Sequence, residues 1–204
     1  MMTHRERMDK GLVYDPFDEE VAKFQRDCME LLYDFNLTRP HELEKRQTLL
    51  KQMFGKIGEN CYIEPPLHSN FGGRHVFMGN NVYANYNLTL VDDGNIYIGD
   101  NVMFAPNVVI ATAGHPIIPE LRMKGLQFNK DVHIGKNVWV GAGAILMHGV
   151  KIGDNTVIGA GSVVTKDIPS DVVAVGNPCR VIRPIGEKDK LYFYKDEVID
   201  WENL

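Results

Sequence analysis

The feature that most constrains this chain is an apolar residue that returns every six positions, in three runs, between Val76 and Asp167. A second apolar or small residue stands two positions before each of these anchors, and Asn, Asp and Gly recur in between. The anchors are Met78, Ala84, Leu90, Ile98, Phe104, Ile110, Ile134, Val140, Leu146, Ile152, Ile158 and Val164. This spacing predicts short strands joined by tight turns, because strands alternate inward and outward residues whereas helices repeat every ~3.6 residues. Three such sides close a triangular coil, and stacked coils form a solenoid with one apolar core.

The repeat is interrupted between Ala113 and Asp131. Continuing its phase would place Pro116, Glu120 and Arg122 at inward positions. Burying Arg and Glu in a narrow apolar core is costly unless both are well paired. We therefore expect residues 113–131 to leave the coil as a protruding loop, and long loops of this kind often carry function.

The residues before the repeat have helical spacing. Apolar residues recur at intervals of three and four over residues 19–35, Asp18 is a suitable N-cap, and a second helix is expected from about Pro40 to Phe54. We expect residues 1–60 to form a helical cap on the open end of a β-helix that spans residues 61–180.

The residues after the repeat are charged and aromatic. This segment, residues 181–204, contains Tyr192, Phe193, Tyr194 and Trp201. Aromatic side chains favour burial, so the tail is expected to fold back and pack on the surface of the β-helix.

The composition narrows the possible partners and the compartment. The formal net charge of −5 over 204 residues argues against nucleic-acid binding. No apolar run is long enough to cross a membrane, and no signal segment is recognisable at the N-terminus. The cysteines Cys28, Cys61 and Cys179 are far apart and odd in number, which predicts free thiols, no metal site and a cytoplasmic location.

Longer motifs make the resemblance to a known family specific. They are residues 83–93 (YANYNLTLVDD), 114–116 (GHP), 137–141 (NVWVG), 159–169 (GAGSVVTKDIP) and 176–183 (GNPCRVIR). In these motifs the chain resembles the galactoside and maltose O-acetyltransferases among the hexapeptide-repeat acyltransferases, and Asn85-Tyr86-Asn87 favours the galactoside branch. The resemblance implies a left-handed parallel β-helix. The hand comes from the resemblance alone, since the usual crossover rule predicts the opposite one.

His115 is the candidate catalytic base. It stands where the loop leaves the coil, and an imidazole can accept a proton near neutral pH, although the position by itself favours a turn histidine with no role. The resemblance implies that His115 deprotonates a sugar hydroxyl, for which the 6-OH is the expected position, and that the hydroxyl attacks the thioester of acetyl-CoA. It further implies that Asn85 holds this hydroxyl and that the backbone N–H of Ala142 stabilises the oxyanion. Without the resemblance, Asn85 would be interpreted as an asparagine that only tolerates the turn at a corner of the coil.

The same resemblance assigns ligands for the acceptor sugar, which could be a galactoside, maltose or a glucoside. Asp93 matches a sugar ligand of the family, and Asn70 lies where the family has a small polar one. An acidic ligand near the N-terminus corresponds to Asp15, with Asp18 as the competing choice.

The cofactor implied is acetyl-CoA. The cofactor-binding candidates are Ala142, Ala160, Thr165, Lys166, Arg180 and Arg183. A small residue at Ala160 leaves room for the pantetheine arm, and the three cations suit the CoA phosphates, although ordinary solvated surface charge is the alternative.

Assembly as a homotrimer with active sites between subunits is expected from the resemblance. Apolar side chains at the outward positions Met103, Trp139, Ile145 and Met147 favour an interface.

Three other functions compete with this one. A γ-type carbonic anhydrase would need three histidines around a metal, with His75, His115, His133 and His148 as candidates. A non-catalytic solenoid subunit would need neither the Gly-His-Pro motif nor the basic cluster. An acetyltransferase for the hydroxyl of an antibiotic or an amino acid would share all the catalytic features.

Overall fold

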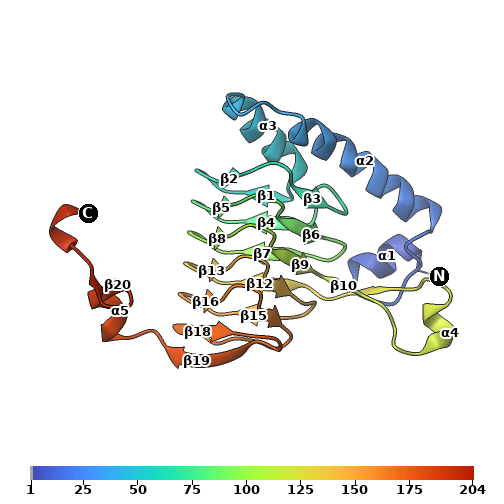
Figure 1. Ribbon diagram of the computed structural model, residues 1–204. Coiled ribbons are helices and arrows are strands. Elements are labelled where there is room, and N and C mark those ends of the chain that lie inside the picture. The colour runs from blue at the N-terminus through green and yellow to red at the C-terminus, as the bar shows by residue number, and fades with distance from the viewer. Residues whose placement is uncertain (1) are drawn as a thin grey trace.

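The computed structural model describes residues 2–204 as a parallel β-solenoid with helices over one end. Its strands form three parallel faces, with successive coils stacked in register (Figure 1). Face 1 contains β1 (Lys56–Ile57), β4 (Val76–Met78), β7 (Ile96–Ile98), β12 (Val132–Ile134) and β15 (Lys151–Ile152). Face 2 contains β2 (Tyr62–Ile63), β5 (Tyr83–Ala84), β8 (Met103–Phe104), β13 (Trp139–Val140), β16 (Val157–Ile158), β18 (Val172–Val175) and the antiparallel β19 (Arg180–Pro184). Face 3 contains β3 (His68–Ser69), β6 (Thr89–Val91), β9 (Val109–Ala111), β14 (Ile145–Leu146) and β17 (Val163–Val164).

The predicted core is confirmed. Every anchor of the six-residue repeat is buried, and so is the residue two positions before it. Phe104 is the largest of the anchors and is 1% exposed. Asn81, Asn101, Asn137 and Asn155 occupy one corner of successive coils with positive φ, the conformation that the tight turns require.

The predicted helical cap is also confirmed. Helix α2 (Glu19–Asn36) begins after the N-cap Asp18, and α3 (Leu43–Met53) follows it. Phe35 and Leu50 belong to the same buried cluster as the anchors, so the two helices close the core at its first coil. A short helix, α1 (His4–Asp9), was not expected, and the first coil begins at Lys56 rather than at residue 61.

The loop leaves the solenoid as predicted, and it is partly regular. Strand β10 (Ala113–Gly114) pairs antiparallel with β11 (Phe128–Asn129), and the one-turn helix α4 (Pro119–Arg122) lies between them. The hairpin projects from the side of the solenoid near the N-terminus (Figure 1). At Gly114 the packing is close, since a Cβ would lie 2.9 Å from the Phe128 ring.

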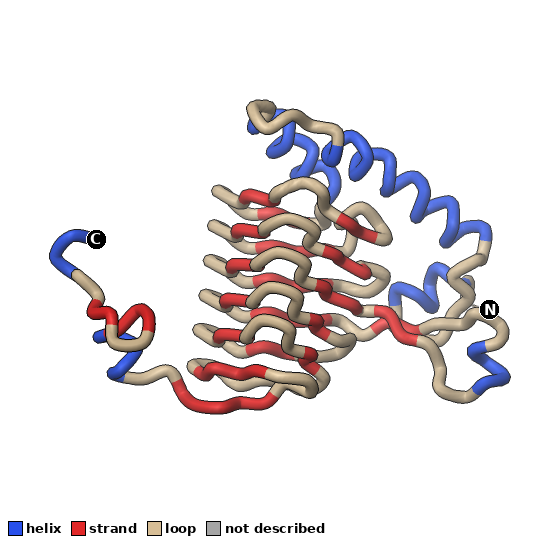
Figure 2. The backbone as a smooth tube through the Cα atoms, viewed as in Figure 1, coloured by secondary structure: helices blue, strands red, loops and turns tan. Residues whose placement is uncertain are grey.

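The C-terminal segment packs on the β-helix of its own chain only at its start, where β19 pairs with β18, and the remainder does not pack there, in contrast to the expectation. Helix α5 (Glu187–Leu191), strands β20 (Tyr192–Tyr194) and β21 (Glu197–Val198) and a final turn (Trp201–Asn203) stand apart from the coils (Figures 1 and 2). We call residues 185–204 the C-terminal arm. Tyr192 and Tyr194 pair with Val198 and Glu197 in a small hairpin, which is not part of the sheets of the solenoid.

No helix within residues 2–204 is both long enough and apolar enough to cross a membrane.

Candidate functional site

The orientation of His115 is set by the loop that carries it. Its Nδ1 lies 2.9 Å from the carbonyl oxygen of Leu126, on the other side of the loop, and the side chain is exposed. A carbonyl can only accept a hydrogen bond, so Nδ1 carries the proton and Nε2 keeps its lone pair. His115 therefore presents a free basic nitrogen outside the solenoid.

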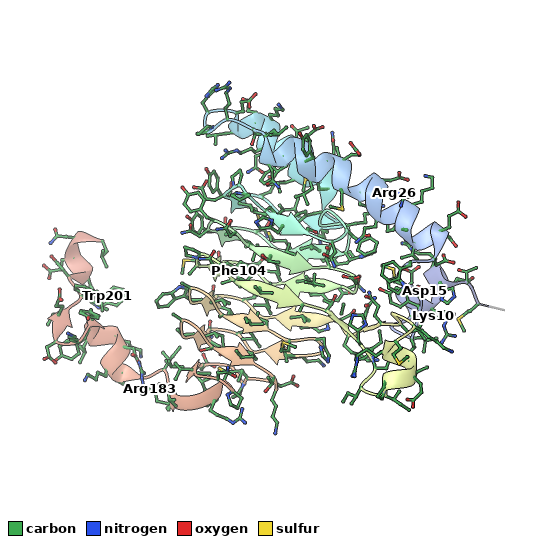
Figure 3. The ribbon with its side chains drawn as sticks, turned by 45° about the vertical axis from the view of Figure 1, so that its right-hand side comes forward. Lys10, Asp15, Arg26, Phe104, Arg183 and Trp201 are labelled. Atoms are coloured by element: carbon green, nitrogen blue, oxygen red, sulfur yellow. The ribbon has the colours of Figure 1, made fainter. Side chains whose placement is uncertain are left out.

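An N-terminal segment is paired with the same loop. Tyr14 and Gln127 exchange two backbone hydrogen bonds of 2.9 and 3.0 Å as an antiparallel bridge. Because Gln127 follows Leu126, this bridge brings Asp15 to the same part of the loop as His115. In Figure 3 the labelled Asp15 lies on the side of the molecule opposite the arm, which bears Trp201.

Two of the expected sugar ligands, Asn70 and Asp93, are in direct contact. The Asn70 amide donates to Asp93 Oδ2 at 2.8 Å, and the Gln127 amide donates to Asp93 Oδ1 at 2.7 Å. The Asn129 amide donates to the Asp93 carbonyl at 2.9 Å. Asp93 is 7% exposed, so these donors hold a nearly buried carboxylate in one orientation.

Tyr14 completes this cluster from the N-terminal segment. Its hydroxyl accepts a hydrogen bond from the Gln127 amide, and the ring is fully buried. Burial, with the nearby Asp93 carboxylate, raises the pKa of Tyr14 well above its ordinary value, so the hydroxyl stays protonated. Tyr14, Gln127 and Asn129 were not predicted. Their positions follow no repeat, so only the meeting of two distant segments identifies them.

The two candidate acidic residues near the N-terminus differ in their surroundings. Asp18 Oδ1 accepts from the backbone N–H groups of Glu20 and Val21, at 3.2 and 3.4 Å, and thereby caps α2. Asp15 Oδ1 accepts from the Phe17 N–H at 2.9 Å, while its Oδ2 has no partner among residues 2–204. Asp18 Oδ2 likewise has no partner among residues 2–204, so each of the two carboxylates has one oxygen available to a ligand.

Asn85, Ala142 and Ala160 lie along the edge between faces 2 and 3, with the coil of Pro106 between those of Asn85 and Ala142. The coils are joined there by backbone hydrogen bonds, such as that from the Gly161 N–H to the Ala142 carbonyl at 2.8 Å. Ala142 is exposed, and its N–H has no acceptor within the part of the chain that the structure describes. Asn85 Oδ1 accepts from the Tyr86 N–H at 2.8 Å, which leaves its amide N–H₂ unpaired among those same residues. This edge offers donors to a ligand.

One chain does not bring Asn85 and His115 together. Asn85 precedes β6 at the edge between faces 2 and 3, whereas the hairpin with His115 leaves from the opposite edge of face 3, after β9. The width of face 3 separates the two residues.

The expected cofactor residues lie toward the last coils. Thr165 and Lys166 are exposed after β17, and Arg180 and Arg183 are exposed on β19. The Arg180 guanidinium donates to the Cys179 carbonyl at 2.8 Å. Arg183 forms two hydrogen bonds of 2.7 Å to the Asp189 carboxylate, and this pairing lowers the pKa of Asp189 to about 2. In this chain the Arg183 guanidinium therefore already has an anionic partner, while Lys166 has none among residues 2–204.

The histidines of the carbonic anhydrase alternative are dispersed. His75 contacts the Asp92 carbonyl through Nδ1 at 2.6 Å, His133 stacks on Tyr97, and His148 packs edge-on against Phe128. Within residues 2–204 no three His, Cys, Asp or Glu side chains are grouped as metal ligands.

Comparison with known families identifies both parts of the chain. Residues 7–58 match the maltose acetyltransferase hexapeptide capping motif. Residues 131–166 match the bacterial transferase hexapeptide family, described as six repeats. These ranges coincide with the helical cap and with the coils after the loop.

Two curated relatives and one solved structure agree with this assignment. The galactoside O-acetyltransferase of Lactococcus lactis subsp. lactis (strain IL1403) is 54% identical over 94% of this chain and 93% of its own. The galactoside O-acetyltransferase of Escherichia coli (strain K12) is 46% identical over 98% of both chains. A galactoside acetyltransferase solved in complex with coenzyme A superposes with a TM-score of 0.94, at 46% identity, over 98% of this chain and 100% of that one. A coil of the opposite hand would not superpose in this way, so the β-helix of this chain is left-handed, as the resemblance implied. The chain belongs to the galactoside and maltose O-acetyltransferases of the hexapeptide-repeat, left-handed β-helix acyltransferases.

Proposed function

We propose that this O-acetyltransferase moves the acetyl group of acetyl-CoA to the hydroxyl of a sugar, a galactoside, maltose or a glucoside, with the 6-OH as the expected position. The observation that carries the proposal is the orientation of His115. Its Nδ1 is held by the Leu126 carbonyl, so Nε2 is the nitrogen that accepts the proton of the attacking hydroxyl. A neutral hydroxyl is a poor nucleophile, and a base at hydrogen-bond distance removes this limitation.

The charge that develops on the thioester oxygen needs donors that are already in place. The unpaired N–H of Ala142 supplies one, and the free amide of Asn85 orients the attacking hydroxyl. Both groups belong to the same edge of the solenoid, where backbone hydrogen bonds join successive coils. No proton has to pass through either of them.

The acceptor sugar is bound by Asp15, Asn70 and Asp93. Sugar hydroxyls donate readily to carboxylates, and Asp15 Oδ2 is open to such a donor. Asp93 is 7% exposed and accepts one hydrogen bond on each oxygen, from Asn70 and Gln127, so both oxygens keep acceptor capacity for a sugar hydroxyl. This preorganisation favours an acceptor with neighbouring hydroxyl groups over a simple alcohol.

The cofactor lies along the edge that bears Ala142 and Ala160, and its phosphates meet Thr165, Lys166, Arg180 and Arg183. Alanines at both coil corners leave room for the pantetheine arm. Lys166 is the cation that is ready to bind phosphate, whereas Arg183 must exchange or share its bond with Asp189.

The enzyme works as a homotrimer with its sites between subunits. The separation of Asn85 from His115 in one chain supports this arrangement, since a neighbouring chain must supply one of them. Met103 and Trp139 are each 50% exposed on face 2, and Ile145 and Met147 are half-buried on or next to face 3. Light scattering should give a mass near three times 23.1 kDa, and a fully active monomer in dilute solution would contradict the arrangement.

An acceptor screen tests the function. Purified protein is incubated with acetyl-CoA and with galactosides, maltose, glucosides, an amino-acid alcohol or a hydroxylated antibiotic, and release of the CoA thiol is followed. Turnover with a sugar and none with the other acceptors is the expected result. Turnover only with a non-sugar hydroxyl would keep the chemistry and overturn the acceptor. A metal-dependent hydration of carbon dioxide without acetyl transfer would overturn the function altogether.

A further inference from the structure

The C-terminal arm carries apolar side chains that its own chain leaves uncovered. Phe193 is 66% exposed, Tyr194 57%, Val198 66% and Trp201 67%. The arm leaves the solenoid after β19 and then runs alongside the coils at a distance (Figures 1 and 2). Large exposed apolar surfaces of this kind mark places where another molecule binds.

The outer half of the arm is also acidic. Residues 194–204 contain Asp196, Glu197, Asp200 and Glu202, with Lys195 as the one cation. The Lys195 ammonium lies over the Tyr194 ring, 5.0 Å from its centroid. The surface that receives this segment should therefore combine aromatic and cationic side chains.

Face 1 of the solenoid has that combination. Phe77, Tyr97 and His133 stack on one another across successive coils, with ring centroids 5.1 and 4.7 Å apart. Lys56 and Lys151 continue the same outward row at its two ends, because they pair in register with Phe77 and His133. These residues line a shallow groove of about 610 Å³. Neither lysine pairs with a carboxylate among residues 2–204.

We propose that the arm of one chain docks on face 1 of a second copy of this chain, with Trp201 and its neighbours against the Phe77–Tyr97–His133 row. The two surfaces match in aromatic character and are opposite in charge, and neither is covered by another element among residues 2–204. An interface between two different patches of the same protein closes into a ring when the rotation allows it. This inference rests on the proposed homotrimer and names a contact that the acetyl-transfer site does not require.

The geometry of the fold favours this pairing. The stacked row on face 1 runs along the axis of the solenoid, and the arm also runs along that axis (Figure 1). In a three-fold ring whose axis is parallel to the solenoids, the arm of one chain and the aromatic row of its neighbour lie at the same level along that axis. The acidic residues then meet Lys56 or Lys151, and the aromatic residues meet the stacked rings.

A photo-crosslink tests the contact directly. Trp201 is replaced by p-benzoylphenylalanine, and heavy-isotope and light chains are mixed before irradiation. The expected product joins residue 201 of one chain to a peptide with Phe77, Tyr97 or His133 of another, as heavy–light pairs. The same replacement at Met123, which is 86% exposed in the loop, is the control and should not reach these peptides. Crosslinks within one chain, or to face 2 of another chain, would overturn the proposal.

The rate of subunit exchange measures how much the contact between the arm and face 1 stabilises the trimer. Trp201→Ala and Tyr97→Ala should each speed exchange between labelled and unlabelled trimers by about 30-fold, the effect of removing an interface hot spot. The double variant should exchange hardly faster than either single one, because both remove the same contact. Additive effects, or wild-type exchange in both variants, would refute the contact while leaving a trimer of unchanged mass. A monomeric wild type would instead refute the homotrimer itself.

Discussion

Replacing His115 tests directly whether this residue is the general base. The His115→Ala change should lower kcat by about 10²–10⁴, which corresponds to about 3–5 kcal/mol of barrier, because a positioned general base is worth that much. The change should have little effect on the stability of the fold. His115 is exposed and makes one side-chain hydrogen bond, to Leu126, so the loss in unfolding free energy should stay below about 1.5 kcal/mol.

A second variant separates proton transfer from positioning. In His115→Gln, the amide can still donate to the Leu126 carbonyl, but it cannot take a proton at neutral pH. It should therefore be as slow as the Ala variant. CoA affinity, measured by calorimetry, should match the wild type in both.

The assay follows the CoA thiol with a disulfide reagent. The protein's own thiols should add little background, because burial raises the pKa of Cys28, Cys61 and Cys179 and so suppresses the reactive thiolate. Near-normal kcat in His115→Ala, or recovery of activity in His115→Gln alone, would refute the assignment of the base.

Three further experiments probe the cofactor site, the core and the arm. Lys166→Ala should weaken CoA binding and flatten its dependence on salt, because phosphate contacts are partly screened; an unchanged affinity would remove Lys166 from the site. Phe104→Ala should cost about 3–5 kcal/mol in urea unfolding, whereas the exposed Met123→Ala should stay within about 0.5 kcal/mol; equal effects would contradict the core. Asp189 should keep its charge down to about pH 2, as carboxyl NMR can show. The contribution of the Asp189–Arg183 pair to the free energy of unfolding should be complete above the carboxyl pKa of the unfolded chain, about 3.9, and should be lost as the pH falls through the lower pKa of the folded chain. If Asp189 instead titrates with an unshifted pKa, the pair does not form in solution.

The solenoid could be predicted from the sequence because its rule is local. Each coil repeats one spacing, so an anchor such as Leu90 or Ile134 is identified by its position alone, and both are buried. The interruption at residues 113–131 could be predicted in the same way, because continuing the repeat there would place charged residues in a narrow apolar core. The start of the first coil was missed by a few residues, because β1 (Lys56–Ile57) precedes the regular part of the pattern.

The surroundings of the site depend on contacts that no spacing encodes. Gln127 reaches Asp93 only because the hairpin folds beside face 3 and pairs with the segment at Tyr14. The partner of Arg183 lies six residues further along, in a turn whose shape the sequence did not predict. The arm was expected on the surface of its own chain, because aromatic residues favour burial, but sequence composition does not say which chain buries them.

The central claim is that each active site combines His115 of one chain with Asn85 of another. It is tested most directly by refolding His115→Ala and Asn85→Ala chains together and measuring acetyl transfer to a sugar. Each variant alone should be nearly inactive. In randomly mixed trimers, about a quarter of the sites should pair an intact His115 with an intact Asn85, so about a quarter of wild-type activity should return. If the mixture stays as inactive as its parents while mixed trimers form, the two residues act within one chain and the claim is wrong.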